Sequence, residues 1–459
     1  MKRRHFIKSI AMITTASSCA CISRSTITGS KEIQIASFKT AFEKEALKGK
    51  FGFKGNYLTE LWQVVSKITS ARGFSGTGLA TQSVLYADAD LFARHSEQAG
   101  NKFMYELTRD ALKIASQKTF TSPIELLDKI LPEVYDSAKS ITGKKYLDVN
   151  FLYNSLVSVD NATWMLYARE NGFNNFDKMI PDLYKKALSN RNNKLALLFL
   201  ATYNMPVNDI KKAVNDGYFV IKIKTGQPGS QQEMLQKDID RLTEIHNSLK
   251  NIITPHTASG KVFYTMDANG RYEKKETLGR YLDHAKKIGA FDQILVYEEP
   301  LAMNNNENVS DLGIRIGADE SIHTEVDAIK KIDLGYGAMV LKGIAKTLSQ
   351  SMKIAKIAFD NNIPCLCADL TVNPILIDWH KNLAARLQPF PKLGMGLMET
   401  NGNINYVNWE NMLKRHPCYG ADWTKIKNGG FELTSDFYKT SGGIFLESEH
   451  YKKMRSFQE

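Results

Sequence analysis

The sequence predicts a closed (β/α)8 barrel of the TIM type, preceded by a smaller α+β capping domain. After about residue 195, short apolar runs alternate with amphipathic helical stretches. Connections of helical length imply parallel strands. Eight strand candidates in roughly 200 residues suit a barrel near the short end of its size range. A doubly wound sheet is the competing architecture, and the chemistry at the strand ends decides between the two.

Residues 31–194 predict the capping domain. Residues 31–55 are mixed, and their glycines at 49, 52 and 55 indicate a loop rich in Phe and Lys. Aromatic and β-branched residues follow in 58–70, and RGFSGTGLAT at 72–81 is typical of a turn followed by a strand. Residues 84–140 predict helices broken at Pro123 and Pro132. Residues 151–171 predict a buried helix that ends near Gly172.

Residues 195–400 predict the barrel, and residues 401–459 a C-terminal segment that packs with the capping domain. The strand candidates are the runs LALLFLATY, YFVIKIK, VFYTMDA, ILVYEEP, IRIGADE, AMVLKG, IPCLCADL and KLGMGLME. The main helical stretches between them are 208–216, 231–250, 276–288, 324–334, 347–361 and 376–387.

Composition excludes several classes of protein. The 459 residues are 43% hydrophobic and 24% charged, which is ordinary for a globular chain. No run of about eighteen apolar residues exists, so a polytopic membrane protein is excluded. The net charge of +11 is scattered outside the N-terminus, and no basic stripe with interleaved aromatics predicts nucleic-acid binding.

Residues 1–30 predict an export signal and spacer. Arg3-Arg4-His5-Phe6-Ile7-Lys8 precedes a short, weakly apolar region, as in twin-arginine signals. We therefore expect a periplasmic protein, or a lipid-anchored one in which Cys19 or Cys21 carries the lipid. A cytoplasmic location follows if the segment is only a basic terminus.

Three cysteines remain after that segment, Cys365, Cys367 and Cys418, too few for a disulfide framework. Cys365 and Cys367 share one face of a strand. Two ligands alone make a poor zinc site, so we interpret both as small buried residues.

The predicted strands end in acids and lysines. In a barrel, the carboxyl ends of the strands surround one cavity. Asp267, Glu298 and Asp319 end three successive runs. Three carboxylates are costly to place together unless a cation neutralises them, and hard oxygen ligands suit Mg²⁺. The sequence thus predicts a Mg²⁺ site, with Mn²⁺ as a substitute.

Two further strands carry lysines. Lys222 and Lys224 are two apart, so both face the interior while Ile221 and Ile223 face outward. Two neighbouring ammonium groups repel, which favours loss of a proton from one of them near neutrality. Lys342 lies four strands further on, on the opposite side of a closed barrel. Such a pair could move a proton from one face of a carbon to the other.

In this order the motifs resemble the enolase superfamily, specifically its muconate-lactonizing-enzyme-like branch. VIKIKTG is similar to the base-bearing strand, which implies Lys224 as base and Lys222 as its electrostatic partner. TMDANGRY, VYEEPL and GADES resemble the three metal strands, AMVLKG the sixth strand, and SVDNATWMLYA the helix that leads into the barrel. The resemblance implies specificity loops in the capping domain, and we expect them at residues 49–57 and 73–86.

The sequence departs from that family at several strand ends. GLMETNG lacks the Asp-x-Asp with which dipeptide epimerases hold an ammonium group, and the seventh strand has no His. Asp369 stands there instead, either binding a substrate amine or hydroxyl or capping the next helix. Glu399 at the eighth strand is a second candidate for substrate binding. Met165 follows Trp164 at a position where the family has Asp, and we interpret this difference as a structural change.

The implied chemistry is abstraction of the α-proton of a small carboxylate substrate, giving a metal-stabilised enediolate. We expect a racemase, epimerase or cycloisomerase. The alternatives are an acid-sugar dehydratase-type lyase and an exported, non-catalytic binding protein with a relic site. We also expect a homo-oligomer.

Overall fold

The computed structural model describes residues 31–53, 56–454 and 457. The predicted signal segment, with Arg3, Arg4, Cys19 and Cys21, lies outside the described residues. Within the described part of the chain, no helix is long and apolar enough to cross a membrane.

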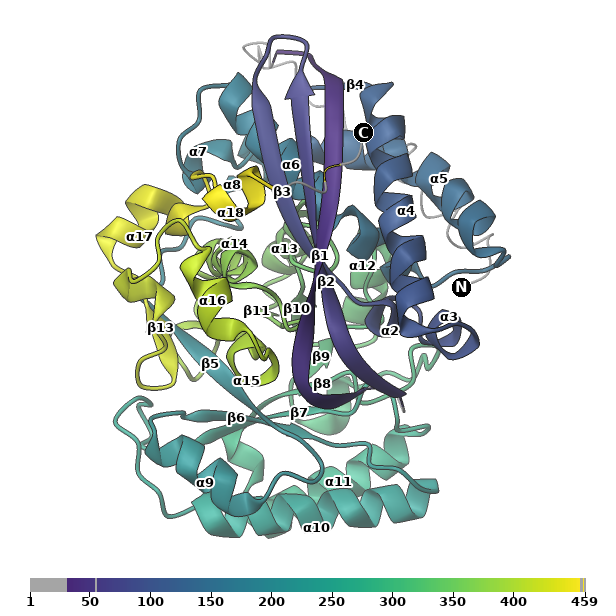
Figure 1. The fold of residues 1–459 in the computed structure, drawn as a ribbon. Helices are drawn as coiled ribbons and strands as arrows, with labels where there is room; N and C mark the ends of the chain where they lie inside the picture. The colour runs from purple at the N-terminus through teal and green to yellow at the C-terminus, as the bar shows by residue number, and fades with distance from the viewer. Residues whose placement is uncertain (1–30, 54–55, 455–456, 458–459) are drawn as a thin grey trace.

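The capping domain is built on a four-stranded sheet with the strand order β3-β2-β1-β4. Its strands are β1 (Ile33–Phe53), β2 (Asn56–Ser70), β3 (Ser75–Gln82) and β4 (Thr119–Phe120). The antiparallel β1–β2 ribbon runs from the side of β4 toward the barrel (Figure 1).

The loop expected around Gly49 is wrong, because β1 continues to Phe53. The pairing of β1 with β2 shifts its register between Ala46 and Phe51, so Gly49 lies in an irregularity within the strand. A glycine inside a strand often marks such a bulge, and a composition-based reading does not distinguish a bulge from a loop.

Two helices that pack against each other, α4 (Glu97–Ser116) and α6 (Val149–Glu170), cover one side of this sheet. The other helices of this part of the chain are α2 (Val84–Ala87), α3 (Ala89–Arg94), α5 (Pro123–Thr142), α7 (Phe176–Met179) and α8 (Asp182–Lys185). The predicted break at Pro123 is confirmed, because Pro123 begins α5 behind the cap of Ser122. The predicted break at Pro132 is wrong. Pro132 is exposed within α5, where water can reach the carbonyl group that its missing N–H leaves unpaired.

The buried helix α6 packs directly on β3. A Cβ atom added to Gly76 would lie 2.1 Å from the carbonyl oxygen of Ala162, and one added to Gly78 would lie 2.1 Å from that of Ser158. The SGTG sequence therefore permits a backbone-to-backbone approach that any side chain would prevent. This contact holds α6, the helix that precedes the barrel, against the capping sheet.

Eight parallel strands close the barrel, as the sequence predicts. In order they are β5 (Lys194–Ala201), β6 (Val220–Lys224), β7 (Phe263–Asp267), β8 (Ile294–Glu298), β9 (Ile316–Ala318), β10 (Ala338–Leu341), β11 (Cys365–Cys367) and β12 (Gly396–Glu399). Closure comes from parallel pairing of β12 with β5, from Gly396 opposite Leu195 to Glu399 opposite Leu198. This pairing excludes the doubly wound sheet.

The outer helices occur where amphipathic periodicity predicts them. They are α9 (Val207–Asn215), α10 (Gln231–Leu249), α11 (Lys275–Lys287), α12 (Glu325–Asp333), α13 (Leu348–Asp360) and α14 (Pro374–Ala384). Two 3-10 turns, Phe291–Gln293 and Ser310–Leu312, precede β8 and β9.

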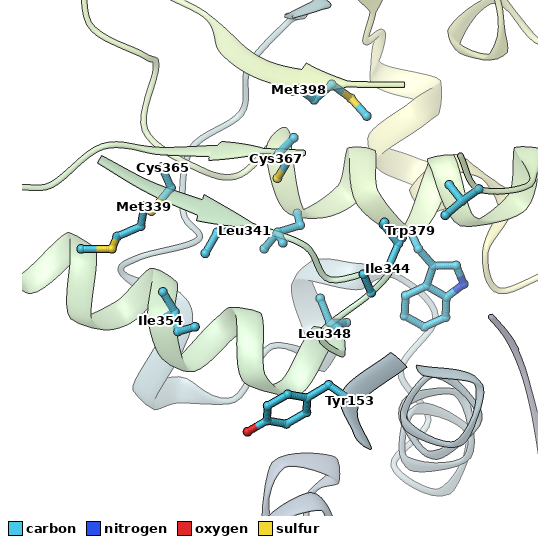
Figure 2. Packing of buried hydrophobic residues seen from close by; sticks show 14 of the residues in the cluster. Tyr153, Met339, Leu341, Ile344, Leu348, Ile354, Cys365, Cys367, Trp379 and Met398 are labelled. Carbon is cyan, nitrogen blue, oxygen red and sulfur yellow. The ribbon is translucent and has the colours of Figure 1, made fainter. Parts of the chain in front are cut away.

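Side chains alternate along the barrel strands between two apolar clusters, one inside the barrel and one between the strands and the outer helices. Val220 packs in the barrel interior, whereas Ile221 and Ile223 pack outward against the helices, as predicted. Cys365 and Cys367 are buried free thiols in the same outer layer. Figure 2 shows them beside Met339, Leu341 and Met398, in a layer that faces α13. The period-2 pattern therefore directs Lys222 and Lys224 into the interior.

The C-terminal segment joins both domains. It contains α15 (Gly402–Asn405), α16 (Trp409–Lys414), β13 (Gly430–Glu432), α17 (Ser435–Thr440) and α18 (Glu449–Lys452), with 3-10 turns at Asp422–Thr424 and Ser441–Gly443. The strand β13 pairs antiparallel with the start of β5. Arg415 contacts Glu43 and Glu45 of β1, each at 2.6 Å.

Candidate active site

A cavity of about 80 Å³ lies at the carboxyl ends of the barrel strands, beneath the β1–β2 ribbon. It brings together all eight residues that the sequence singles out. These are Lys222, Lys224, Asp267, Glu298, Asp319, Lys342, Asp369 and Glu399. Each extends from a different barrel strand or its end, except for the Lys222–Lys224 pair on β6.

Lys222 is the most highly paired cation of the cavity. Its Nζ lies 3.0 Å from Asp267 Oδ2, 2.8 Å from Glu298 Oε2 and 3.1 Å from Glu399 Oε2. The side chain is only 4% exposed. Such burial is tolerable because carboxylates on three different strands compensate the charge.

These partners reverse the expected effect of the lysine pair on Lys222. Burial lowers the pKa of Lys222, but Asp267, Glu298 and Glu399 outweigh it and raise this pKa well above its ordinary value. The expectation that repulsion eases proton loss is therefore wrong for Lys222 as it lies here. The contact between Lys222 and Glu399, across the closing strands, is what the sequence could not show.

Lys224 extends further toward the mouth of the cavity. Its Nζ donates to Asp267 Oδ2 at 2.7 Å and to Asn269 Oδ1 at 2.6 Å. The Asn269 side chain in turn donates to Glu320 Oε1 at 2.8 Å. Although burial opposes it, Lys222 and Lys224 together lower the pKa of Asp267 to about 2.

Lys342 enters the cavity from β10, four strands around the barrel from β6 and thus opposite to it. Its ammonium group pairs with Asp319 Oδ2 and lies 5.3 Å from the ring centre of Tyr86. Burial would lower the pKa of Lys342, but Asp319 raises it well above its ordinary value.

Lys346 holds Asp319 from the other side. Its Nζ donates to the Asp319 carbonyl oxygen at 2.6 Å and to the Ile322 carbonyl oxygen at 3.1 Å. Glu299 accepts from the Asp319 N–H at 2.8 Å and from the Ser321 hydroxyl at 2.9 Å. The sequence places Glu299 at a strand end beside Glu298, but it indicates no role for it. Sequence reasoning missed Lys346, for which the only available signal was its spacing of four residues from Lys342.

The three predicted metal ligands fit a divalent cation in donor type. Asp267, Glu298 and Asp319 end adjacent strands, and Glu298 Oε1 is buried and accepts no hydrogen bond from the described residues. Burial, together with Asp267, raises the pKa of Glu298 well above its ordinary value. A carboxylate in that condition gains most from a nearby cation.

Lysine side chains contact all three of these carboxylates. Among the described residues, no three His, Cys, Asp or Glu side chains form a group arranged to hold a metal ion. Ammonium groups instead contact the three carboxylates: Lys222 and Lys224 contact Asp267, Lys222 contacts Glu298, and Lys342 contacts Asp319.

Three residues near the cavity have a strained backbone conformation with positive φ. Asn269, Glu299 and Thr371 follow the ends of β7, β8 and β11 with φ values of +46°, +35° and +53°. L-residues rarely adopt this conformation, and it costs about 1–3 kcal/mol at each position. The surrounding hydrogen bonds hold these residues in place, which is common where side chains must be placed accurately.

Asp369 and Glu399 have different surroundings. Glu399 pairs with Lys222, so its contact is with another site residue. Asp369 accepts from the backbone N–H of Asn401 at 2.8 Å. Burial, and then Glu399, raise the pKa of Asp369 to about 7. The alternative in which Asp369 caps the next helix is wrong, because the Asn373 side chain caps α14.

The capping domain contributes an apolar wall. Leu47, Leu58 and Leu61 of the β1–β2 ribbon line the cavity, and Ser83 and Tyr86 line it after β3. The first three flank residues 49–57, and the last two lie in or at the edge of 73–86, the two expected specificity regions. The exact residues could not be predicted, because the register of the ribbon decides which leucines face inward.

A larger cavity of about 470 Å³ lies between α14 and the C-terminal segment. Its floor carries Asp378, Lys381 and His416, hereafter the Asp378 cluster. Lys381 Nζ lies 2.7 Å from Asp378 Oδ1, and His416 Nε2 lies 2.7 Å from Asp378 Oδ2. None of the strand-end lysines or metal-type carboxylates lines this cavity, so the smaller cavity is the candidate active site.

Together, the fold and the cavity define a capped (β/α)8-barrel protein with a polar site at the carboxyl ends of its strands. Solved structures that share this fold are members of the enolase superfamily. The predicted resemblance is confirmed at the level of the fold. No family model matches the chain, and no curated protein matches it.

Three solved structures illustrate the likeness. A member of the enolase superfamily from Listeria innocua is 15% identical, with a TM-score of 0.62 over 93% of this chain and 98% of that one. The L-talarate dehydratase of Polaromonas sp., complexed with Mg and L-glucarate, is 16% identical, with a TM-score of 0.58 over 88% and 93%. A dipeptide epimerase of Enterococcus faecalis, complexed with Mg and L-Leu-L-Tyr, is 15% identical, with a TM-score of 0.57 over 88% and 98%.

Proposed function

We propose that the protein is a metal-dependent enzyme of the enolase superfamily that abstracts the α-proton of a carboxylate substrate. The reaction we favour is a racemisation or epimerisation, or a cycloisomerisation. One observation carries the proposal: Lys224 and Lys342 enter the same cavity from opposite strands of a closed barrel, with carboxylates on the strands between them.

Asp267, Glu298 and Asp319 would hold Mg²⁺, for which Mn²⁺ could substitute. When bound, the cation would supply positive charge to the carboxylate oxygens as the α-proton leaves. An α-proton next to a carboxylate is very weakly acidic, so the base needs this charge stabilisation. The Mg complexes of the dehydratase and epimerase with this fold support this choice of metal.

The lysines would act on the two faces of the α-carbon. Lys224 would remove or deliver the proton on one face and Lys342 on the other. Lys222, held by Glu399, would place a fixed positive charge beside the site. Lys346 and Glu299 would keep Asp319 in position. The capping ribbon would exclude water from the cavity.

Proton exchange in D₂O tests the assignment of the two faces. Lys224→Ala should stop deuterium incorporation into one stereoisomer of a substrate and leave exchange of the other, and Lys342→Ala should do the reverse. Each loss should reach about 10²–10⁴-fold, the usual contribution of a general base. Interconversion should fail in both variants. Equal loss for both isomers in Lys342→Ala would favour a lyase or a one-base mechanism.

A dehydratase-type lyase is the second candidate, because the talarate dehydratase has the same fold. In that case one lysine would remove the proton and the other would assist departure of a β-hydroxyl group. A non-catalytic binding protein is the remaining alternative. It would show no exchange with any carboxylate that binds.

We further propose that residues 1–30 direct export by the twin-arginine route. The support is the Arg3-Arg4 pair ahead of a weakly apolar stretch. Arg3→Lys combined with Arg4→Lys should retain the protein in the cytoplasm, as fractionation would show. Undiminished export of the double variant would contradict this route.

A further inference from the structure

Each lysine that lines the cavity contacts a proposed metal ligand and also a second group that is not a proposed ligand. When the ligands hold a metal ion, the second groups would remain to hold the lysines. In two of the three pairs, the second group is a side-chain oxygen on the barrel. In the third it is an aromatic ring of the capping domain. The pairs are Lys222 with Glu399, Lys224 with Asn269, and Lys342 with Tyr86.

The contact between Lys342 and Tyr86 is a buried cation–π contact. Lys342 Nζ lies 5.3 Å from the centre of the Tyr86 ring, within the range of about 6 Å in which a ring attracts a cation. Tyr86 is 3% exposed and Lys342 is 7% exposed. Because water does not screen the attraction, the contact belongs to the strong, desolvated kind.

The backbone around Tyr86 is fixed by two helices of the capping domain. All four residues of α2, which contains Tyr86, are buried. The Ser83 N–H donates to Asn154 Oδ1 of α6 at 3.1 Å, and the Val84 N–H donates to Asn101 Oδ1 of α4 at 2.9 Å. The ring is therefore held from behind, as a group that positions another side chain must be.

Resting on the proposed function, we infer that Tyr86 is a positioning residue for Lys342. Its ring holds the ammonium group at the reacting carbon, and the role needs the ring and not the hydroxyl. Tyr86 and Lys342 lie in different domains, so Lys342 is held in this way only while the capping domain lies on the barrel. Lys224 needs no such help, because Asn269 holds it within the barrel.

An NMR experiment tests the contact without substrate or metal. Asp319→Ala removes the carboxylate partner of Lys342 and leaves the ring of Tyr86. In protein labelled with [ε-¹³C]lysine, the Lys342 signal is assigned by its loss in Lys342→Met. Its order parameter should remain that of a fixed side chain in Asp319→Ala. Adding Tyr86→Leu should lower it to the value of exposed lysines. Adding Tyr86→Phe should not, because a phenyl ring also attracts a cation.

Proton exchange in D₂O with Mg²⁺ tests the consequence for the reaction. The probes are N-acetyl-L-leucine and N-acetyl-D-leucine, which present the α-proton on opposite faces. Tyr86→Leu should lower kcat/KM about thirtyfold for the isomer that depends on Lys342. This factor corresponds to about 2 kcal/mol, the worth of a desolvated cation–π contact. Exchange of the other isomer should stay within about threefold, and Tyr86→Phe should keep both isomers within about threefold.

Tyr105→Leu is the matched control. Tyr105 is a buried tyrosine of α4 in the same domain, and it does not line the cavity. Its loss should lower the stability of the capping domain, as Tyr86→Leu also does, without changing the ratio of the two exchange rates. A changed ratio in Tyr105→Leu would show that the ratio reports on stability and would overturn the inference.

The other outcomes separate this inference from the proposed function. Equal slowing of both isomers in Tyr86→Leu would overturn the inference, and so would an equal loss in Tyr86→Phe and Tyr86→Leu. A mobile Lys342 in Asp319→Ala, or a fixed one after Tyr86→Leu is added, would also overturn it. If the wild type exchanges neither isomer, the result counts against the proposed function for these probes, and the NMR result alone decides the inference.

Discussion

The cavity at the strand ends and the Asp378 cluster both bury lysine against carboxylate, but they balance charge differently. In the Asp378 cluster, Lys381 satisfies its hydrogens internally. Its Nζ contacts Asp378 Oδ1 and the Trp423 carbonyl oxygen, each at 2.7 Å, and lies 3.9 Å from the ring centre of Phe431. His416 covers the other oxygen of Asp378.

The cavity at the strand ends has more acids than lysines, even with Lys346 counted, and strained backbone after several strands. Two of its acids, Glu320 and Asp369, have no cationic partner among the described residues. Buried charge by itself therefore does not identify a site in this protein. An imbalance of charge that the chain does not compensate is the more specific sign.

The largest expected effect comes from a substitution that breaks the ion pair of the Asp378 cluster. Lys381→Met should lower the free energy of unfolding by about 3–5 kcal/mol, because it leaves the buried Asp378 without its ammonium partner. Chemical denaturation measures this loss. Proton exchange per folded molecule should stay as in the wild type. A loss below about 1 kcal/mol would show that the Asp378 cluster is not the tight ion pair described.

A second prediction tests Mg²⁺ binding in the cavity at the strand ends. Mg²⁺ at about one hundred times its dissociation constant should stabilise the wild type by about 2.7 kcal/mol, since it binds only the folded chain. Glu298→Gln should abolish this gain in a thermal unfolding series. Glu320→Gln is the matched control, because Glu320 lines the same cavity without being a proposed ligand. A wild-type gain in Glu298→Gln would remove Glu298 from the metal site.

The smallest expected effect concerns Asp160, a buried carboxylate with no lysine or arginine partner among the described residues. It accepts from the Ser349 backbone N–H at 3.1 Å and from the Ser349 hydroxyl. Burial raises the pKa of Asp160 to about 6. Because the pKa is raised on folding, its contribution to stability is complete below the unfolded value near 4 and is lost as the pH rises through about 6.

Asp160→Asn removes this titration. Relative to the wild type, the variant should therefore gain about 2 kcal/mol of stability between about pH 4.5 and about pH 7.5. Urea denaturation of both proteins at the two pH values measures this difference of differences. A constant gap between the two proteins would mean that Asp160 keeps an ordinary pKa in the folded state.

Most of the barrel could be predicted because its signals are local. Each strand run is short, apolar and followed by an amphipathic helix, and alternation alone directs Lys222 inward and Ile221 outward. The helix break predicted at Pro132 was wrong because a helix tolerates proline where the position is exposed. Exposure is a property of the tertiary structure, which the sequence pattern does not show.

The charged residues that line the cavity were predictable from the sequence, but the ion pairs between them were not. Strand order places Lys224 and Lys342 on opposite sides once closure is assumed. That Glu399 would contact Lys222 depends on the register of β12 against β5 and on side-chain conformations that no sequence pattern specifies. Lys346 and Glu299 contact the backbone of Asp319, which no sequence pattern indicates. The position of the apolar wall depends on how the capping ribbon lies on the barrel.

The first barrel strand has consequences for how this chain must fold. β5 pairs with β6, but also with β12 and with β13, whose residues follow more than two hundred positions later. Likewise, Leu47 meets Tyr406 from the opposite end of the chain. These contacts give the protein a high contact order, which slows folding because long loops must close first. A chain that ended before β12 would leave one edge of β5 unpaired and the barrel open, so we expect the barrel to close only after residues 396–399 have been synthesised.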